Sequence, residues 1–414
     1  MAYTLLTDIS MLVTVAAGSR GRKSGEEMRD IGVITDGAML FNEKILWTGR
    51  TDEAQNYLEN TSITAEIRSA NGKTVMPGFV DSHTHIVFAG SRANEFARRL
   101  RGTTYQEIAA EGGGILRTMR ATRAATEDEL YETGRHIAIA AMQYGTTTIE
   151  IKSGYGLTVE SELNLLRAAN RLRKDLSQRV VVTFMGAHDF PPEFSQNRDE
   201  YVQIVCDEML PAAAGLAEFC DVFTDTGYFT VEQSKKILKT AANLGFRLKV
   251  HADELSPFGA AEMAAALGSI SADHLLFCSE AGMDAMKNAG TIATLLPGTA
   301  YSLRLPYAPA RAMLDRGLSV AIATDCNPGS CYMENMQLAL SLSCVNMRLT
   351  VEESVTAATL NGAAALGISD ITGSLEMGKY ADFLILDCAE YSELVYHFGG
   401  NRVSEVWIAG KRTV

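Results

Sequence analysis

The chain has 414 residues, of which 47% are hydrophobic and 21% charged, so it carries enough apolar material for a large core and is not broadly disordered. This length exceeds an ordinary domain of roughly 100–200 residues but suits a βα barrel with a small accessory domain. The formal net charge of −13 disfavours binding to a phosphate backbone, and we expect no nucleic acid partner. Seven cysteines without C-x-x-C spacing predict reduced thiols and a cytoplasmic protein. The N-terminal apolar stretch lacks a basic start and is interrupted by Asp8, which predicts neither a signal peptide nor a membrane span.

Both ends of the chain have the pattern of short strands separated by turns. Residues 1–74 contain several such runs, with Asp36-Gly37 as a hairpin signal. Residues 373–414 return to the same pattern. We therefore predict one composite β-sandwich domain built from 1–74 plus 373–414.

The middle of the chain, residues 75–372, alternates apolar runs with helix-patterned stretches. Such alternation predicts a parallel sheet that is buried on both faces. Eight units predict an α/β fold of the closed (β/α)8 TIM-like barrel type, which would be the catalytic domain. The expected strands are Val75–His85, Thr146–Ser153, Val180–His188, Cys220–Asp225, Phe246–Glu254, Ser271–Leu276, Thr291–Leu296 and Ser319–Asp325.

Polar side chains stand at the carboxyl ends of these expected strands. In a barrel these ends converge on one mouth, where active sites lie. Five of the seven histidines of the chain are among them. The residues concerned are His83, His85, Tyr155, His188, His251, Glu254, His274 and Asp325.

Four of these residues form a candidate metal site. His83 and His85 are two positions apart on a strand and therefore point to the same side. His251 ends the fifth expected strand and Asp325 the eighth. Three imidazoles and one carboxylate suit zinc or iron and leave a position open for water. Alone, His251 could be a packed core residue and Asp325 a helix N-cap, but neither alternative explains why both follow apolar strands.

Several motifs resemble the amidohydrolase superfamily over essentially the whole chain. They are the run from Pro77 to His85, the run from His251 to Glu254, His274, Thr324-Asp325, and the run from Gly373 to Phe383. The resemblance implies the two-part β domain and a catalytic metal. Members with two metals carry a bridging residue on a middle strand, whereas Lys152 ends the second strand. We therefore expect one metal ion per chain, with Lys152 paired to a carboxylate or facing solvent.

Four local segments narrow the resemblance to one branch of the superfamily. They are residues 88–96, 151–157, 184–188 and 325–330. Their combination is similar to the branch that hydrolyses the cyclic amide of 4-imidazolone-5-propanoate to N-formimidoyl-L-glutamate in histidine degradation. The resemblance implies that substrate and a homodimer. Ser330 stands where this branch often has threonine, and either hydroxyl could donate the same hydrogen bond.

The candidate substrate contacts suit a small ring with one carboxylate on a tail. Arg92 could hold the carboxylate by two charge-assisted hydrogen bonds, although a surface arginine is the alternative. Tyr155 could present its hydroxyl or simply anchor its loop, and His188 could donate to the ring carbonyl or pack in the core. The loop after Asp325 could add polar contacts from Asn327, Gly329 and Ser330.

The expected chemistry is metal-assisted hydrolysis. Glu254 would accept the proton of the attacking water and pass it to the leaving ring nitrogen, which makes it both catalytic and substrate-binding. His188 or His274 would stabilise the oxyanion, His274 could instead orient the water, and Asp325 could be ligand, base or both. The division of these roles stays open, as does motion of the Gly-rich loop at 111–114 as a lid.

Two other functions share part of this pattern. A mononuclear deaminase of cytosine- or guanine-like rings would use the same histidines and acids, but Arg92 favours a substrate with a carboxylate. A non-catalytic barrel would be expected to have lost metal ligands, and this chain keeps a full set.

Overall fold

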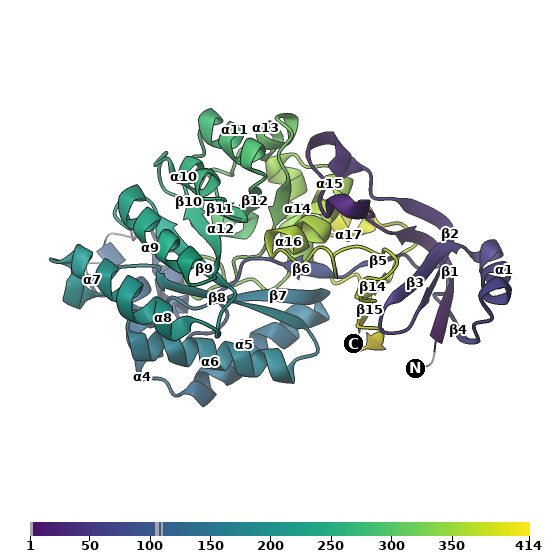
Figure 1. Cartoon of the computed structure of the whole chain (residues 1–414), viewed down its shortest axis with the longest axis horizontal. Helices are drawn as coiled ribbons and strands as arrows, with labels where there is room; N and C mark the ends of the chain where they lie inside the picture. Colours follow the sequence, from purple (N-terminus) through teal and green to yellow (C-terminus); the bar gives the residue numbers. More distant parts are fainter. Residues whose placement is uncertain (1–2, 104–106, 109–110) are drawn as a thin grey trace.

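The middle of the chain is a barrel of parallel strands. The computed structural model describes residues 3–103, 107–108 and 111–414. Within these residues the barrel sheet has eight strands in the order β13-β12-β11-β10-β9-β8-β7-β6, and Figure 1 shows it surrounded by helices. Its strands are β6 (Phe79–Asp81), β7 (Thr146–Lys152), β8 (Arg179–Ala187), β9 (Phe219–Thr224), β10 (Arg247–Ala252), β11 (Ser271–His274), β12 (Ile292–Leu295) and β13 (Val320–Ile322). This confirms the predicted barrel.

The barrel closes at the ends of β6 and β13, where the histidine pair lies. The backbone NH of Asp325 donates to the carbonyl of His83 at 3.0 Å, and that of His85 donates to Cys326 at 2.9 Å. Below them, Asp81 accepts hydrogen bonds from the backbone and hydroxyl of Thr324 at 3.0 and 2.6 Å. This closure places the carboxylate that follows the last strand beside the histidines that follow the first.

Helices cover the outside of the barrel in the usual βα alternation. Several begin with a threonine whose hydroxyl accepts a hydrogen bond from the first turn, as Thr126 does at α5 and Thr158 at α6. The helices between and after the barrel strands are α2 (Ala93–Leu100), α4 (Ile115–Ala124), α5 (Glu127–Gln143), α6 (Val159–Asp175), α7 (Arg198–Ile204), α8 (Leu210–Ala213), α9 (Val231–Asn243), α10 (Ala260–Ala266), α11 (Glu280–Ala289), α12 (Pro297–Leu303), α13 (Ala310–Asp315), α14 (Met336–Met347), α15 (Val351–Ala358) and α16 (Leu360–Ala365). No helix of the described residues is long and apolar enough to cross a membrane.

The two ends of the chain share a second, mixed sheet, as predicted. Its order is β16-β15-β14-β5-β1-β2-β3, with β4 also paired to β1. The strands are β1 (Tyr3–Val13), β2 (Val33–Phe41), β3 (Ile45–Arg50), β4 (Ala65–Ser69), β5 (Val75–Pro77), β14 (Phe383–Leu386), β15 (Val403–Ile408) and β16 (Lys411–Arg412); two helices, α1 (Thr51–Thr61) and α17 (Glu393–Tyr396), lie in the same terminal segments.

This terminal sheet curls around its own core. Phe41 of β2 contacts Phe383 of β14 and Trp407 of β15, with ring centroids 5.1 and 5.6 Å apart. In the sheet order, β1 and β5 lie between β2 and β14. The contact therefore requires the sheet to fold over, which gives the sandwich-like core expected from the sequence.

The expected strand Val75–His85 is wrong in one respect, because it is two strands. Its first part, β5, pairs with β1 and β14 of the terminal sheet, and β6 belongs to the barrel. The chain passes between the sheets at Gly78, whose backbone NH donates to Asp382 at 3.0 Å. A Cβ at Gly78 would overlap the side chain of Thr147. The apolar run is continuous across this point, so the break is not visible in the hydrophobic pattern.

Candidate metal centre and active site

The carboxyl ends of the barrel strands enclose a cavity of about 580 Å³. Most of the candidate site residues lie on its wall, although they come from segments up to 245 positions apart, from His85 to Ser330. The lining includes His85, Arg92, Tyr155, His188, His251, Glu254, His274, Asp325, Asn327, Gly329 and Ser330. His83 lies directly beneath and is fully buried.

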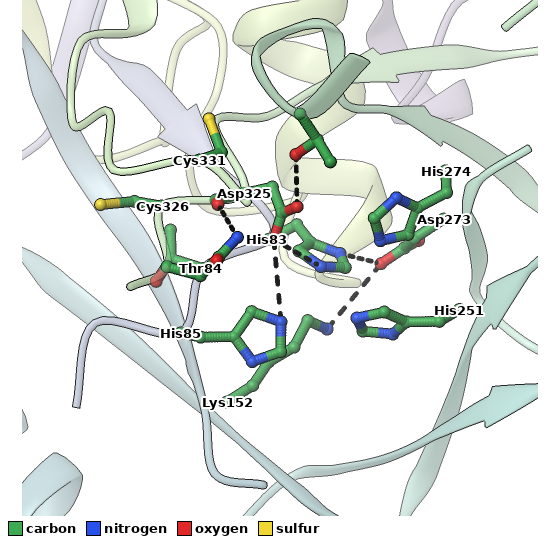
Figure 2. A network of polar contacts seen from close by, with 12 residues as sticks. His83, Thr84, His85, Lys152, His251, Asp273, His274, Asp325, Cys326 and Cys331 are labelled. Carbon is green, nitrogen blue, oxygen red and sulfur yellow. Dashed lines mark hydrogen bonds and ion pairs between the residues drawn. The ribbon is translucent and has the colours of Figure 1, made fainter. Parts of the chain in front are cut away.

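The predicted ligands are brought together (Figure 2). Ring nitrogens of His83, His85 and His251 lie within 4.8 Å of one another, and a second group joins His83 with His274 and Asp325. Oδ1 of Asp325 is 3.5 Å from Nε2 of His83 and 3.8 Å from Nε2 of His85. The two groups share His83, so His274 joins the four residues expected from the sequence as a further possible ligand.

The donor set fits a transition metal. Nε2 of His83 is buried and has no hydrogen-bond partner among the described residues, although burying such an atom unpaired is costly. Burial, followed by the neighbouring cationic and imidazole groups, holds the pKa of both His83 and His85 well below the ordinary value. Their rings are therefore neutral, which is the form that ligates zinc or iron.

Two of the site residues have left-handed backbone conformations. Asp325 has a φ of 53° and His274 a φ of 74°. Such values are uncommon outside glycine and cost energy, and they concentrate where side chains are aimed at a functional centre. At Asp325 the second carboxylate oxygen, Oδ2, accepts a hydrogen bond from Thr299, so Oδ1 is the oxygen that faces the histidines. Sequence patterns carried no signal for this backbone geometry.

A layer of buried charges lies beneath the ligands. Lys152 contacts Asp221 at 2.7 Å and Glu150 at 2.9 Å, and all three side chains are fully buried. Of the two environments considered for Lys152, the carboxylate pair is confirmed. Burial lowers its pKa, but Asp221 and Glu150 outweigh burial and leave the pKa of Lys152 above the ordinary value, so the ammonium is charged.

Glu254 and His274 stand side by side on the cavity wall. Nε2 of His274 is 3.5 Å from Oε2 of Glu254. Burial, reinforced by the charge of Asp325, raises the pKa of Glu254 well above its usual value. A raised pKa makes a carboxylate a stronger proton acceptor than an ordinary one, which suits a proton carrier.

Arg92 is held in place by a buried carboxylate. Its Nε donates to Glu95 at 2.8 Å, and Glu95 also accepts from the backbone of Gly114 at 3.2 Å. The guanidinium lies against Gly329, where a Cβ would overlap Nη1. Arg99 borders the same cavity and donates from Nη2 to the carbonyl of Gly329 at 3.2 Å. Two arginines thus flank Gly329.

Tyr155 and His188 line the same cavity and contact one another. Tyr155 is buried, and its ring centroid is 5.8 Å from that of His85 and 5.3 Å from that of His188. Nδ1 of His188 lies 3.0 Å from the carbonyl oxygen of Gly154. A carbonyl only accepts, so Nδ1 carries the proton in this contact. Burial lowers the pKa of His188 to about 3, so its ring is neutral and Nε2 is an acceptor.

The loop after Asp325 is organised by the side chain of Asn327. Its Oδ1 accepts from the backbone of Gly329 and Ser330, both at 2.8 Å. Its Nδ2 donates to the carbonyl of Asp325 at 2.7 Å. Direct contacts of this loop with substrate stay a prediction. So does lid motion at 111–114, where Glu111 pairs with Arg98 at 2.6 Å.

Several residues around the site were missed by the sequence reasoning. They are Glu95, Arg99, Asp221, Lys249, Asp273 and Thr299. Asp273 directly precedes His274, and strand alternation would have placed the two side chains on opposite faces, whereas both lie beside His83. The left-handed φ of 74° at His274 departs from regular strand geometry. Glu95 stands three positions after Arg92, a spacing at which side chains of a helix meet, so this pair could have been found from the sequence. No local signal marks Thr299, because its contact with Asp325 joins residues 26 positions apart.

A family comparison and a comparison with solved structures both find matches to this chain. The sequence pattern of the amidohydrolase family matches residues 74–413. Among solved structures, a triazine hydrolase variant covers 100% of this chain and 94% of its own, at a TM-score of 0.75 and 19% identity. A zinc-bound adenosine deaminase from Xanthomonas campestris matches 100% of this chain and 93% of its own, at a TM-score of 0.72 and 20% identity. The chain belongs to the amidohydrolase family.

Closer relatives narrow the family further. The imidazolonepropionase of Shouchella clausii is 47% identical over 99% of this chain and 92% of its own length. The imidazolonepropionase of Symbiobacterium thermophilum is also 47% identical, over 99% of this chain and 97% of its own length. At this identity over nearly the whole length, the chain belongs with the imidazolonepropionases, which confirms the branch indicated by the sequence. It is a hydrolase of carbon–nitrogen bonds in a metal-dependent family.

Proposed function

We propose that the protein hydrolyses the cyclic amide of 4-imidazolone-5-propanoate to N-formimidoyl-L-glutamate. The observation that carries this proposal is the shared cavity of Arg92, Tyr155 and the imidazole cluster. Arg92, fixed by Glu95, suits the single carboxylate of this substrate, and Arg99 borders the same cavity. The close relatives supply the substrate class.

The metal is proposed to be one zinc or iron ion held by His83, His85, His251 and Asp325. Such an ion polarises a carbonyl and lowers the pKa of a bound water to about 7. His274 lies in the second group of possible ligands, with His83 and Asp325. Its Nε2 lies toward Glu254, which favours a role in proton transfer over permanent ligation.

Glu254 is the best candidate for the proton carrier. Oδ2 of Asp325 is engaged by Thr299 and its Oδ1 faces the histidines, so Asp325 is better suited to ligation. Glu254 lies on the cavity wall with a raised pKa and with His274 beside it. It would accept the proton of the attacking water and deliver it to the ring nitrogen as the amide bond breaks.

The tautomer of His188 favours an accepting role. Its Nδ1 proton is directed to Gly154, so the neutral ring offers Nε2 as an acceptor for an N–H of the substrate ring. The alternative of donation to the ring carbonyl would need a second proton on the imidazole. His274 is then the histidine better suited to stabilise the oxyanion.

The test is to follow loss of freshly prepared 4-imidazolone-5-propanoate by ultraviolet absorbance, with mass analysis of the product. We expect acceleration over the spontaneous rate, a mass gain of one water, and loss of activity on metal removal. Turnover of amino-substituted heterocycles in place of this substrate would overturn the substrate assignment and favour a deaminase.

We further propose that the protein works in the cytoplasm as a homodimer. All seven cysteines are free thiols, five of them buried, which suits a reducing compartment. Light scattering coupled to size-exclusion chromatography tests the dimer, for which a mass near twice the 44.8 kDa of the chain is expected.

A further inference from the structure

A closed layer of charged side chains lies inside the barrel, directly beneath the imidazole cluster. It consists of Glu150 and Lys152 from β7, Asp221 from β9, Lys249 from β10 and Asp273 from β11. Each of these side chains has no solvent exposure. Burying five charges is expensive, and a hydrophobic layer of the same volume would serve stability as well or better. The layer therefore calls for a reason other than stability.

The contacts of the two aspartates supply that reason. Oδ2 of Asp273 accepts a hydrogen bond from Nδ1 of His83 at 2.6 Å. Oδ2 of Asp221 lies 3.0 Å from Nδ1 of His251, and its Oδ1 accepts from the backbone of His251 at 3.1 Å. A neutral imidazole whose Nδ1 proton goes to a carboxylate has its lone pair on Nε2. For His83 this leaves Nε2 as the atom available to a metal, and the carboxylate of Asp221 beside Nδ1 of His251 favours the same orientation there.

The two lysines hold those aspartates in position. Lys152 contacts Asp221 at 2.7 Å and lies 3.8 Å from Asp273. Lys249 lies 3.5 Å from the same oxygen of Asp273 and is anchored by the carbonyl of Ser82 at 2.7 Å. Glu150 lies between the lysines, 2.9 Å from Lys152 and 3.1 Å from Lys249. Each lysine thus has a carboxylate on more than one side and a fixed place.

We propose that Lys152 and Lys249 are positioning residues of the metal centre, which act through Asp221 and Asp273 to fix the tautomer and orientation of His251 and His83. This inference rests on the proposed metal site. Carboxylates that accept the outer N–H of a ligating histidine typically change metal affinity 10- to 100-fold when removed. The lysines in turn hold these carboxylates, and Lys152 acts on both His251 and His83 because it lies beside both Asp221 and Asp273.

The contacts predict a specific pattern of effects. Asp273→Ala should disturb His83 and leave His251 unchanged, and Asp221→Ala should do the reverse. Lys152→Met should disturb both, because Lys152 contacts both aspartates. If the layer were purely structural, each variant would lower the free energy of unfolding. Removal of one carboxylate would then not change one histidine in particular.

The tautomers can be read in the metal-free protein by nitrogen NMR with ¹⁵N-labelled histidine, since the chain has only seven histidines. Signals are assigned from His83→Gln and His251→Gln. Competition of each variant with a chromophoric chelator for Zn²⁺ gives the affinity. We expect wild-type His83 and His251 to be protonated at Nδ1, and Zn²⁺ affinity to fall about 10- to 100-fold in each variant of the layer.

A matched control removes a buried carboxylate far from the site. Glu353 is fully buried and paired with Arg311 at 2.9 Å and Arg29 at 3.0 Å. Glu353→Gln should lower the free energy of unfolding but leave the tautomers and Zn²⁺ affinity unchanged. If Lys152→Met does not fold, the double variant Glu150→Gln/Lys152→Met removes one charge of each sign and keeps the net charge of the layer.

The outcomes separate this inference from the proposed function. Wild-type protein that binds no Zn²⁺ would contradict the proposed metal site itself. Wild-type binding with unchanged tautomers in the folded Lys152 and aspartate variants would overturn the positioning role. A loss of affinity with both histidines still protonated at Nδ1 would overturn it as well.

Discussion

Replacing Gly329 with alanine should weaken substrate binding by displacing Arg92. A Cβ at position 329 would overlap Nη1 of Arg92 and lie 2.9 Å from its Cζ. The backbone of Gly329 is outside the left-handed region, so alanine adds steric conflict with the side chain and no backbone strain. The guanidinium must therefore move while its Nε remains attracted to Glu95 at 2.8 Å.

The magnitude follows from the contact that is lost. A hydrogen bond to a charged group contributes about 1.5–3 kcal/mol, which corresponds to roughly 10- to 150-fold in kcat/KM. The contact to a remote carboxylate holds the substrate in both ground and transition states, so the change should be mainly in KM. Steady-state kinetics with the natural substrate and with its tail amide, which lacks the charge, measure the effect.

A double-mutant cycle with Arg92→Ala tests the reasoning directly. If Gly329→Ala acts through Arg92, it should change kcat/KM less than about threefold in the Arg92→Ala background. An undiminished effect in that background would refute the steric argument and point to a direct contact of the Gly329 backbone with substrate. As a control on an outer helix, Gly282→Ala in α11 should leave KM unchanged.

Three further predictions concern the chemistry and the metal. Glu254→Gln should lower kcat about 10²- to 10⁴-fold with a smaller change in KM, measured by steady-state kinetics, because the amide cannot carry the proton; near-normal turnover would move that role to His274 or Asp325. Removal of metal with a chelator should abolish turnover and lower the melting temperature, and added zinc or iron should restore both, whereas His85→Asn should resist restoration. The metal-free protein should lose stability as the pH falls below about 6.5. The reason is that the unfolded chain then binds protons on histidines that stay neutral in the fold. His188 is one of them, because burial lowers its pKa to about 3. Each such histidine adds a slope of about 1.4 kcal/mol per pH unit, measurable by urea unfolding, and a flat profile between pH 6.5 and 5 would contradict the burial argument.

Local patterns in the chain were enough to predict the barrel and the main groups of the centre. Continuous apolar strands that alternate with helices leave few arrangements other than a parallel barrel, and the strand period places His83 and His85 on one side. Because the carboxyl ends of all barrel strands converge, His251 and Asp325 could be assigned to the same centre without any knowledge of distances. These inferences rest on periodicities that are local in the chain.

Features that depend on contacts between distant segments could be known from the fold alone. The break at Gly78 is set by pairing with β1 and β14, and the left-handed φ of Asp325 and His274 by closure and packing at the barrel mouth. The proton on Nδ1 of His188 is fixed by the carbonyl of Gly154, 34 positions away. Likewise, the role of the buried Lys152 and Lys249 depends on their contacts with Asp221 and Asp273, which lie on other strands. A hydrophobic pattern records which way a side chain faces, but not which partner it meets, and that partner fixes tautomer, orientation and charge.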